Sequence, residues 1–282
     1  MTDRMTQPEL ESYLWGAAII LRGLVDAGGV GLNRNPGSTA DVSPDGRFAI
    51  FTSTASDLVA GVSDTNGGAD VFLRDRLTGT TERVSVSLTG GDGNDASGLG
   101  ARQVVSDDGR FVVFASHASD LVPGDGNGTM DVFVRDRTTS TTERVSVASD
   151  GAEGDLDSGT LAVISADGRF VAFNSTARNL VPGDTNRVSD IFVRDRAAGR
   201  TIRVSVSSIG VQANGYNGHT LWRGLSMTPD GLTIAWSSEA TNLVPGDTNG
   251  FPDIFVRKAC DVPCPPYNPP WPVSPTPSPV PA

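Results

Sequence analysis

The chain alternates short apolar runs with polar turns, at a spacing typical of β-strands. Residues 110–115 (RFVVFA) form a continuous apolar and β-branched run, as expected of a buried strand, and residues 131–135 (DVFVR) alternate apolar and polar positions. Two shorter runs, at residues 103–106 and 143–147, precede and follow this pair. A Ser-x-Asp-Gly segment joins the first run to the second, and it is typical of a tight hairpin in which Gly adopts a positive φ. The pattern predicts four consecutive antiparallel strands.

The four-strand pattern occurs four times along the chain. Its Asp-Gly turn recurs at Asp45, Asp108, Asp167 and Asp230, at steps of 63, 59 and 63 residues. A fixed period of this size indicates a repeat protein, and four antiparallel strands per repeat describe one blade of a β-propeller. We therefore predict an all-β fold, a β-propeller of four blades at about residues 38–88, 101–148, 160–207 and 222–258.

Two segments of the first repeat resemble a known family. SPDGRFAIF (residues 43–51) and DVFLRDRLTGTTERVSV (residues 70–86) are similar to the WD-like β-propeller repeat of TolB-like proteins, and the resemblance covers about residues 38–258. It implies a propeller fold and an extracytoplasmic location, periplasmic or secreted. It implies little about function, because propellers host unrelated activities. The period is longer than the roughly 40–45 residues of WD-type blades.

The additional residues of each repeat fall in two loops. In the first repeat these are residues 56–70, between the second and third strands, and residues 88–98, between the fourth strand and the next blade. Both connections of a four-stranded antiparallel blade emerge on the same side, so we expect Asp70 and Gly93 on one face, here called the long-loop face. Loops on a rigid scaffold usually carry binding, and we expect a protein or carbohydrate partner there.

The first of these loops contains the pattern Asp-x-Asn-Gly-x-x-Asp. Oxygen ligands at alternate positions, a Gly that lets the chain curl back and a closing carboxylate suit Ca²⁺. The pattern also resembles the Asp-rich calcium loops of integrin-type propeller blades, although it is one ligand pair shorter. The alternative is a metal-free Asx turn. The candidate calcium ligands are Asp64, Asn66 and Asp70; Asp125, Asn127 and Asp131; Asp184, Asn186 and Asp190; and Asp247, Asn249 and Asp253.

Composition and the scarcity of recurring catalytic residues favour binding over catalysis. With 22 Lys and Arg against 33 Asp and Glu, the formal charge is −11, so no nucleic-acid partner is expected. We expect no membrane span either. His117 and His219 do not recur between repeats and are expected to be surface residues. We predict a non-catalytic binding or scaffold module; the alternative is a carbohydrate-active or peptide-processing propeller enzyme that uses carboxylates of its face.

Both ends of the chain lie outside the repeat. Residues 1–30 predict an amphipathic helix, and residues 9–28 are similar to the start of the modification (M) subunit of type I restriction systems. We interpret this segment as a fusion or a misplaced start of translation; a restriction-modification fragment is the less favoured alternative. Residues 259–282 form a proline-rich tail in which NPPW (residues 268–271) is expected to be linker. Cys260 and Cys264 predict either a local disulfide or two free thiols.

The fourth repeat lacks a fourth-strand sequence. After the third strand at residues 253–257 the chain is interrupted by Pro, and no counterpart of the ERVSV run at residues 143–147 follows. We therefore predict a three-stranded last blade, with residues 253–257 as an edge strand.

Overall fold

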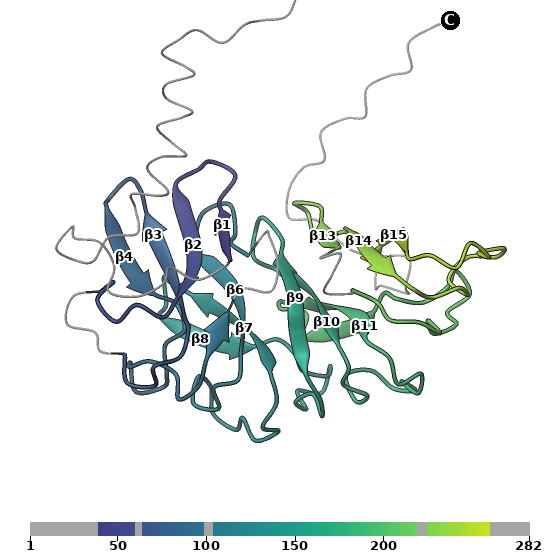
Figure 1. The fold of residues 1–282 in the computed structure, drawn as a ribbon, viewed down its shortest axis with the longest axis horizontal. Helices are drawn as coiled ribbons and strands as arrows, with labels where there is room; N and C mark the ends of the chain where they lie inside the picture. The colour runs from purple at the N-terminus through teal and green to yellow at the C-terminus, as the bar shows by residue number, and fades with distance from the viewer. Residues whose placement is uncertain (1–38, 60–63, 99–103, 219–223, 260–282) are drawn as a thin grey trace, which may run out of the picture.

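The computed structural model describes residues 39–59, 64–98, 104–218 and 224–259. In these residues the fold is all-β, with fifteen strands in four antiparallel sheets (Figure 1). Several predicted features lie outside the described residues. They are the helix at residues 1–30 with its restriction-subunit resemblance, His219, Cys260, Cys264 and the proline-rich tail.

Each sheet is a meander in which consecutive strands are neighbours. The first two sheets are β1 (Ala40–Val42), β2 (Phe48–Ser53), β3 (Asp70–Asp75) and β4 (Thr80–Arg83), followed by β5 (Ser97–Gly98), β6 (Phe111–Ser116), β7 (Asp131–Asp136) and β8 (Thr141–Arg144). The third sheet contains β9 (Ser158–Ile164), β10 (Phe170–Ser175), β11 (Asp190–Asp195) and β12 (Arg200–Arg203). The fourth contains β13 (Leu225–Met227), β14 (Thr233–Ser238) and β15 (Asp253–Lys258). These are the four predicted blades.

The inner strands of the second and third blades begin earlier than the sequence pattern suggests. β5 starts at Ser97 and β9 at Ser158, ahead of the expected blade starts at 101 and 160. At each site a pair of buried serines joins the first strand of the blade to the second. In the third blade Ser158 Oγ of β9 lies 2.8 Å from Ser175 Oγ of β10. The corresponding distance from Ser97 Oγ to Ser116 Oγ is also 2.8 Å. Polar residues here hold strands together, which an apolar pattern does not reveal.

In the last three blades the Asp-Gly hairpin packs against the blade before it. In the second blade Gly109 has a φ of 70°, and a Cβ at this position would lie 2.1 Å from the ring of Phe48 in the first blade. Gly168 has the same relation to Phe111, also at 2.1 Å. Glycine is therefore needed twice over, for the turn conformation and for the close approach of the preceding blade.

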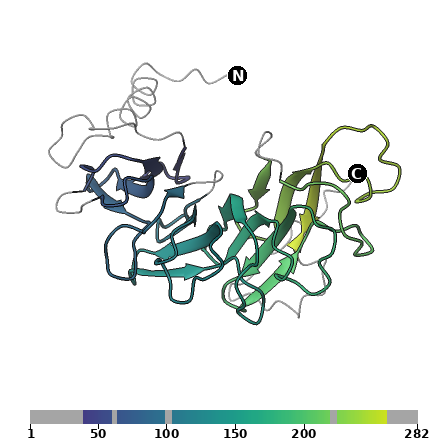
Figure 2. The same cartoon turned by 60° about the horizontal axis from the view of Figure 1, so that its bottom comes forward.

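The blades pack face to face along an arc, as Figures 1 and 2 show. Phe114 and Phe133 stack on one face of the second blade with ring centroids 5.8 Å apart, and both rings are almost fully buried. Phe173 and Phe192 repeat this arrangement in the third blade at 5.9 Å. One apolar core runs through the first three blades, and a second core joins the third blade to the fourth.

The last blade confirms the predicted strand count. Its sheet has three strands, and no other described strand pairs with the outer edge of β15. The side chains of Ile254 and Val256 on β15 are 67% exposed. Residues 253–257 therefore form an edge strand, as predicted.

Candidate binding face and its aspartate loops

The two kinds of long loop lie on the same face and contact each other. The amide of Asn66 donates to the carbonyl oxygen of Gly93 at 2.5 Å, which confirms that the Asp70 loop and the inter-blade loop share one face. Asn127 makes the same bond to Gly154 O at 2.9 Å. In the third blade the acceptor is Ala213 O, 3.1 Å from Asn186 Nδ2. The Asn of each loop is thus the residue that joins it to the next inter-blade connection.

The inter-blade loops are bound in turn to the following blade. Asn94 donates to Ser119 Oγ at 2.9 Å and accepts from the Ser119 backbone N–H at 2.8 Å. At the last interface Asn214 repeats this pair of bonds with Thr241, at 3.0 and 2.9 Å. The loops of the long-loop face therefore form a connected layer held by the blades beneath them.

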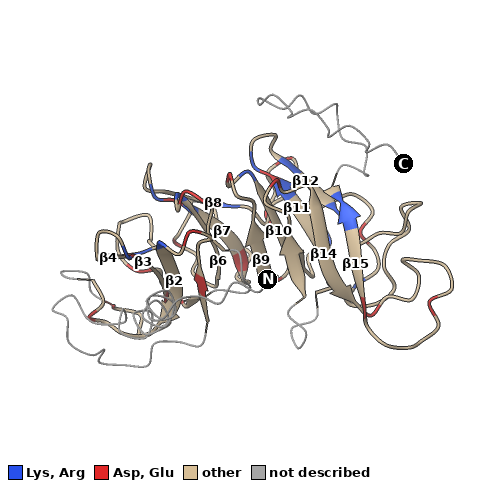
Figure 3. Cartoon of the chain, turned by 90° about the horizontal axis from the view of Figure 1, so that it is seen from above, with Lys and Arg blue, Asp and Glu red and all other residues tan. Residues whose placement is uncertain are grey.

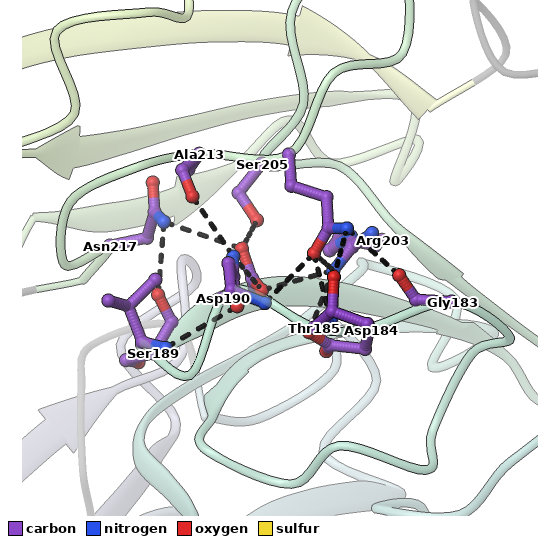
Figure 4. Close-up of polar contacts among 12 residues, drawn as sticks. Gly183, Asp184, Thr185, Ser189, Asp190, Arg203, Ser205, Ala213 and Asn217 are labelled. Carbon is purple, nitrogen blue, oxygen red and sulfur yellow. Dashed lines mark hydrogen bonds and ion pairs between the residues drawn. The ribbon is translucent and has the colours of Figure 1, made fainter.

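An arginine lies between the two aspartates of the third-blade loop (Figure 4). Nη1 of Arg203, from β12, lies 3.0 Å from Asp184 Oδ1 and 3.3 Å from Asp190 Oδ2. The second oxygen of Asp190 accepts a 2.5 Å hydrogen bond from Ser205. Asn186 donates to Asp190 Oδ2 at 2.8 Å. The predicted ligand residues do converge, but they converge on a guanidinium of their own blade.

The second blade has the same arrangement, and in the first the arginine contacts one aspartate of the loop and one of the inter-blade connection. Nη1 of Arg144 lies 3.2 Å from Asp125, 3.4 Å from Asp131 and 2.7 Å from Glu153. In the first blade Nε of Arg83 lies 3.3 Å from Asp70 Oδ2, and Nη1 lies 3.9 Å from Asp92 Oδ1. Sequence reasoning missed these arginines, although they recur in the fourth strands as Arg83, Arg144 and Arg203.

Burial dominates the electrostatics of these loops. It raises the pKa of Asp70 to about 6, while a hydrogen bond from Ser85 and the charge of Arg83 act in the opposite direction. Burial likewise raises the pKa of Asp131 and of Asp190. A single guanidinium only partly compensates two carboxylates that have lost most of their water.

The fit of these loops to calcium differs between blades. Asp64, Asp70 and Asp92 bring carboxylate oxygens within 4.8 Å of one another, and carboxylates suit Ca²⁺. In the second and third blades, however, an arginine lies between the two loop carboxylates, and in the first blade Arg83 lies against Asp70 and Asp92. The oxygen of Asn127 also accepts the Thr129 N–H at 2.9 Å, as an Asx turn requires. The metal-free alternative describes these three loops better.

The loop of the fourth blade has no such arginine among the described residues. Asn249 donates to Asp253 Oδ2 at 3.3 Å and accepts from Phe251 N at 2.8 Å, so the turn itself is retained. Asp247, Asn249 and Asp253 border a hollow of about 610 Å³ that extends to Ile254 and Val256.

The opposite face carries ion pairs between arginine and acidic residues. Arg47 binds Asp75 through two hydrogen bonds of 3.1 and 2.7 Å, which lower the pKa of Asp75. Arg137 pairs with Glu82 of the preceding blade. Figure 3 shows Lys and Arg positions gathered toward the ends of β8, β12 and β15 on this side.

His117 is exposed, as expected. No helix of the described residues is long and apolar enough to span a bilayer.

Comparison with known proteins finds similar folds only. No protein-family model matches the chain, and no curated protein matches it. Among solved structures, TolB from Acinetobacter baumannii is 18% identical with a TM-score of 0.40, over 81% of this chain and 43% of that one. The putative TolB from Agrobacterium tumefaciens is 14% identical with a TM-score of 0.43, over 81% and 78%. The β-propeller domain of the trilobed protease from Pyrococcus furiosus is 12% identical with a TM-score of 0.47, over 79% and 56%.

The chain spans less than half the length of the Acinetobacter protein. At these identities and TM-scores the similarity assigns no activity to this chain.

Proposed function

We propose that the chain is a non-catalytic binding or scaffold module, acting outside the cytoplasm, that contacts a protein or carbohydrate partner through its long-loop face. The observation that carries the proposal is the distribution of exposed apolar side chains. Nine large apolar side chains of the described residues are exposed, and six of them belong to loops of this face. These six are Leu88, Ile209, Val211, Tyr216, Val244 and Phe251. Apolar side chains left exposed on a hydrogen-bonded layer of loops are typical of a contact surface.

The alternative is a carbohydrate-active or peptide-processing enzyme that uses carboxylates of this face. It has less support because the best-positioned carboxylates are inaccessible. The side chains of Asp131 and Asp190 are both 0% exposed, and each faces an arginine of its own blade. A general acid or base must reach its substrate directly or through one water.

The test compares two apolar positions on opposite faces. Ile209→Ser with Val211→Ser alters the long-loop face, and Leu77→Ser alters the opposite face, where Leu77 is 77% exposed. Binding is measured on a glycan array and by photo-cross-linking to a cell-envelope fraction. We expect the long-loop variant to lose the contacts of the native chain and Leu77→Ser to keep them. Loss in Leu77→Ser alone would contradict the proposal.

Calcium binding is a second proposal, and one observation favours a single loop for it. Asp247, Asn249 and Asp253 form the one described copy of the pattern in which no arginine pairs with either carboxylate. Calcium would then gather these ligands only in the folded chain, so millimolar Ca²⁺ should raise the melting temperature relative to a chelator. Asp253→Asn should abolish the shift, whereas Asp184→Asn in the arginine-filled loop should leave it. Equal melting temperatures with Ca²⁺ and with chelator would support the metal-free Asx turn in all four blades.

A further inference from the structure

A cavity of about 330 Å³ opens on the long-loop face between the third and fourth blades. It is lined by the beginning of β9, the end of β10 and the connection that leads into the fourth blade. The polar residues of its lining include Ser158, Thr160, Asn174, Ser189, Tyr216 and Asn217. This volume is at the lower end of the range of ligand pockets, roughly 300–1,000 Å³, and suits one small ring.

Three lining residues depart from the repeat. Asn174 stands where the other blades have Thr52, Ala115 and Ser237, as the strand registers show. Tyr216 takes the place of Ala96 and Asp157, and Asn217 that of Ser97 and Ser158. Small residues suffice at these positions for the fold of the other blades. Asn217 is matched to Trp236, which donates to it and stands where the other blades have Phe. Asn174 and Tyr216 have no such counterpart, and all three residues meet at this cavity.

The two asparagines are buried and held in fixed orientations. Asn174 is 7% exposed; its oxygen accepts the Leu161 N–H at 2.8 Å, and its amide donates to Thr160 Oγ1 at 2.6 Å. Because the backbone N–H can only donate, it determines which end of the Asn174 amide is the oxygen.

Asn217 is 0% exposed and is held in the same way. Its amide donates to Ser189 O at 3.0 Å, toward which it points in Figure 4. Its oxygen accepts a 3.1 Å hydrogen bond from Trp236 Nε1 in the fourth blade. The polar floor of the cavity is thus preorganised by contacts to both blades.

The chemistry of the lining is neutral and hydroxyl-rich. Ser158, Thr160, Ser175, Thr176 and Ser189 contribute hydroxyls to the lining. Those of Ser158 and Ser175 are buried and bond to each other, whereas Thr160 and Thr176 are exposed and each keep the capacity for a further hydrogen bond. The described lining contains one ionisable carboxylate, that of Asp157, which lies at the exposed rim, and no Lys, Arg or His. A charged ligand group would lose water here without an opposite charge to pair with, which is costly. An uncharged ligand that carries hydroxyls can bond to the exposed Thr160 and Thr176 hydroxyls without that cost.

Tyr216 adds an aromatic surface at the rim. Its side chain is 52% exposed, while its backbone carbonyl accepts the Glu239 N–H at 2.9 Å. The ring is therefore carried by an anchored backbone and is available to a ligand. An aromatic ring beside a hydroxyl-rich floor can contact the apolar face of a ring whose edges carry hydroxyls.

From this combination we propose that the cavity binds one ring of an uncharged sugar, with Asn174 orienting the hydroxyl floor and Tyr216 covering the ring. The inference rests on the proposed function, because it names the ligand class for one part of the long-loop face. A neutral peptide is the competing ligand class, and the test below includes it.

The test uses the full chain and ligand-observed saturation-transfer NMR with isothermal titration calorimetry. The probes are cellobiose and N,N′-diacetylchitobiose, with glucuronate and glucosamine as charged comparisons and the peptide Ala-Ser-Ala as the neutral alternative. We expect binding of an uncharged disaccharide, at least tenfold weaker in Asn174→Ser and in Tyr216→Ala. Both changes insert residues that other blades already carry at these positions. Thr138→Ala, on the opposite face, should leave the affinity unchanged.

The bond between Trp236 and Asn217 supplies an independent readout. In a variant with Trp15, Trp222 and Trp271 replaced by Phe, the remaining Trp236 emission should shift on sugar binding.

Each remaining outcome overturns the sugar assignment: no binding of the disaccharides, binding of the peptide alone, or affinity unchanged in Asn174→Ser and Tyr216→Ala. The broader proposal fails separately, if the partner contacts survive Ile209→Ser with Val211→Ser.

Discussion

The third and fourth blades carry the same third-strand motif in opposite environments. Ile191 and Val193 of β11 are 0% and 2% exposed, whereas Ile254 and Val256, at the same positions of β15, are both 67% exposed. The sequences DIFVRD and DIFVRK differ at the last residue only. The difference is the blade that follows, which covers β11 and has no described counterpart beyond β15. Burial in a repeat protein therefore depends on the neighbour at least as much as on the strand itself.

Two ion pairs of the third blade have no counterpart in the next repeat, because both residues of each pair are replaced. Arg196 of the third blade pairs with Glu143 of the second, but the corresponding positions at the next interface are Ala259 and Ile202. The pair of Arg169 and Asp195 within the third blade likewise becomes Leu232 and Lys258 in the fourth. Because both residues of each ion pair change together, neither replacement leaves one residue of the pair without its partner.

The largest effect is expected from the arginine that the fourth-blade loop lacks. Arg203→Met leaves Asp184 and Asp190, which are 3% and 0% exposed, without a countercharge. The cost should be about 3–5 kcal/mol of unfolding free energy, measured by urea denaturation. Asp253→Asn, in the more open fourth loop, should change stability by less than about 0.5 kcal/mol. Equal costs would show that the arginine does not compensate the third loop.

A matched pair of apolar truncations tests the difference in burial between β11 and β15. Ile191→Ala should destabilise the chain by about 2–5 kcal/mol, because it removes a fully buried side chain and leaves a cavity. Ile254→Ala changes the same position of the motif where it is exposed, and should cost less than about 0.5 kcal/mol. Thermal and urea unfolding of both variants provide the check. A large cost for Ile254→Ala would mean that this face is covered in solution.

A smaller, pH-dependent effect is expected from the first loop. Burial raises the pKa of Asp70 to about 6, above its ordinary value of 3.8, so the folded chain binds this proton first as the pH falls. Protonation of Asp70 should therefore increase the free energy of unfolding as the pH falls from 7 to 4, by at most about 3 kcal/mol. This contribution should be lost as the pH rises through 6.

Asp70→Asn tests this linkage while keeping an acceptor for Ser85. The measurement is the slope of unfolding free energy against pH between 5 and 7, which should be flatter in the variant. Asp131 and Asp190 act in the same direction, because burial also raises the pKa of each. A slope identical to that of the native chain would exclude Asp70 as a contributor.

Local patterns predicted the fold well because each blade repeats the same short turn and strand sequences. The Asp-Gly hairpin, the buried second strand and the third strand appear where residues 43–51 and 70–75 predict them. The predicted alternation of the third strand was wrong for the first three blades, where β3, β7 and β11 are buried along most of their length because neighbouring blades cover them. The missing fourth strand of the last blade was also evident, since no such run follows residue 258. The starts of β5 and β9 were harder to predict because serine pairs rather than apolar residues hold them.

The site was predicted less completely, for a physical reason. The sequence placed each pair of loop aspartates, and the shared face of the loops follows from strand order alone. Only the tertiary structure brings Arg83, Arg144 and Arg203 against those aspartates, because each arginine comes from a strand 13 to 19 residues further along the chain. The same holds for the cavity beside Asn174 and Asn217, whose walls come from two blades. Short-range patterns determine strands and turns, whereas charge compensation and cavities depend on which distant side chains the packed blades bring together.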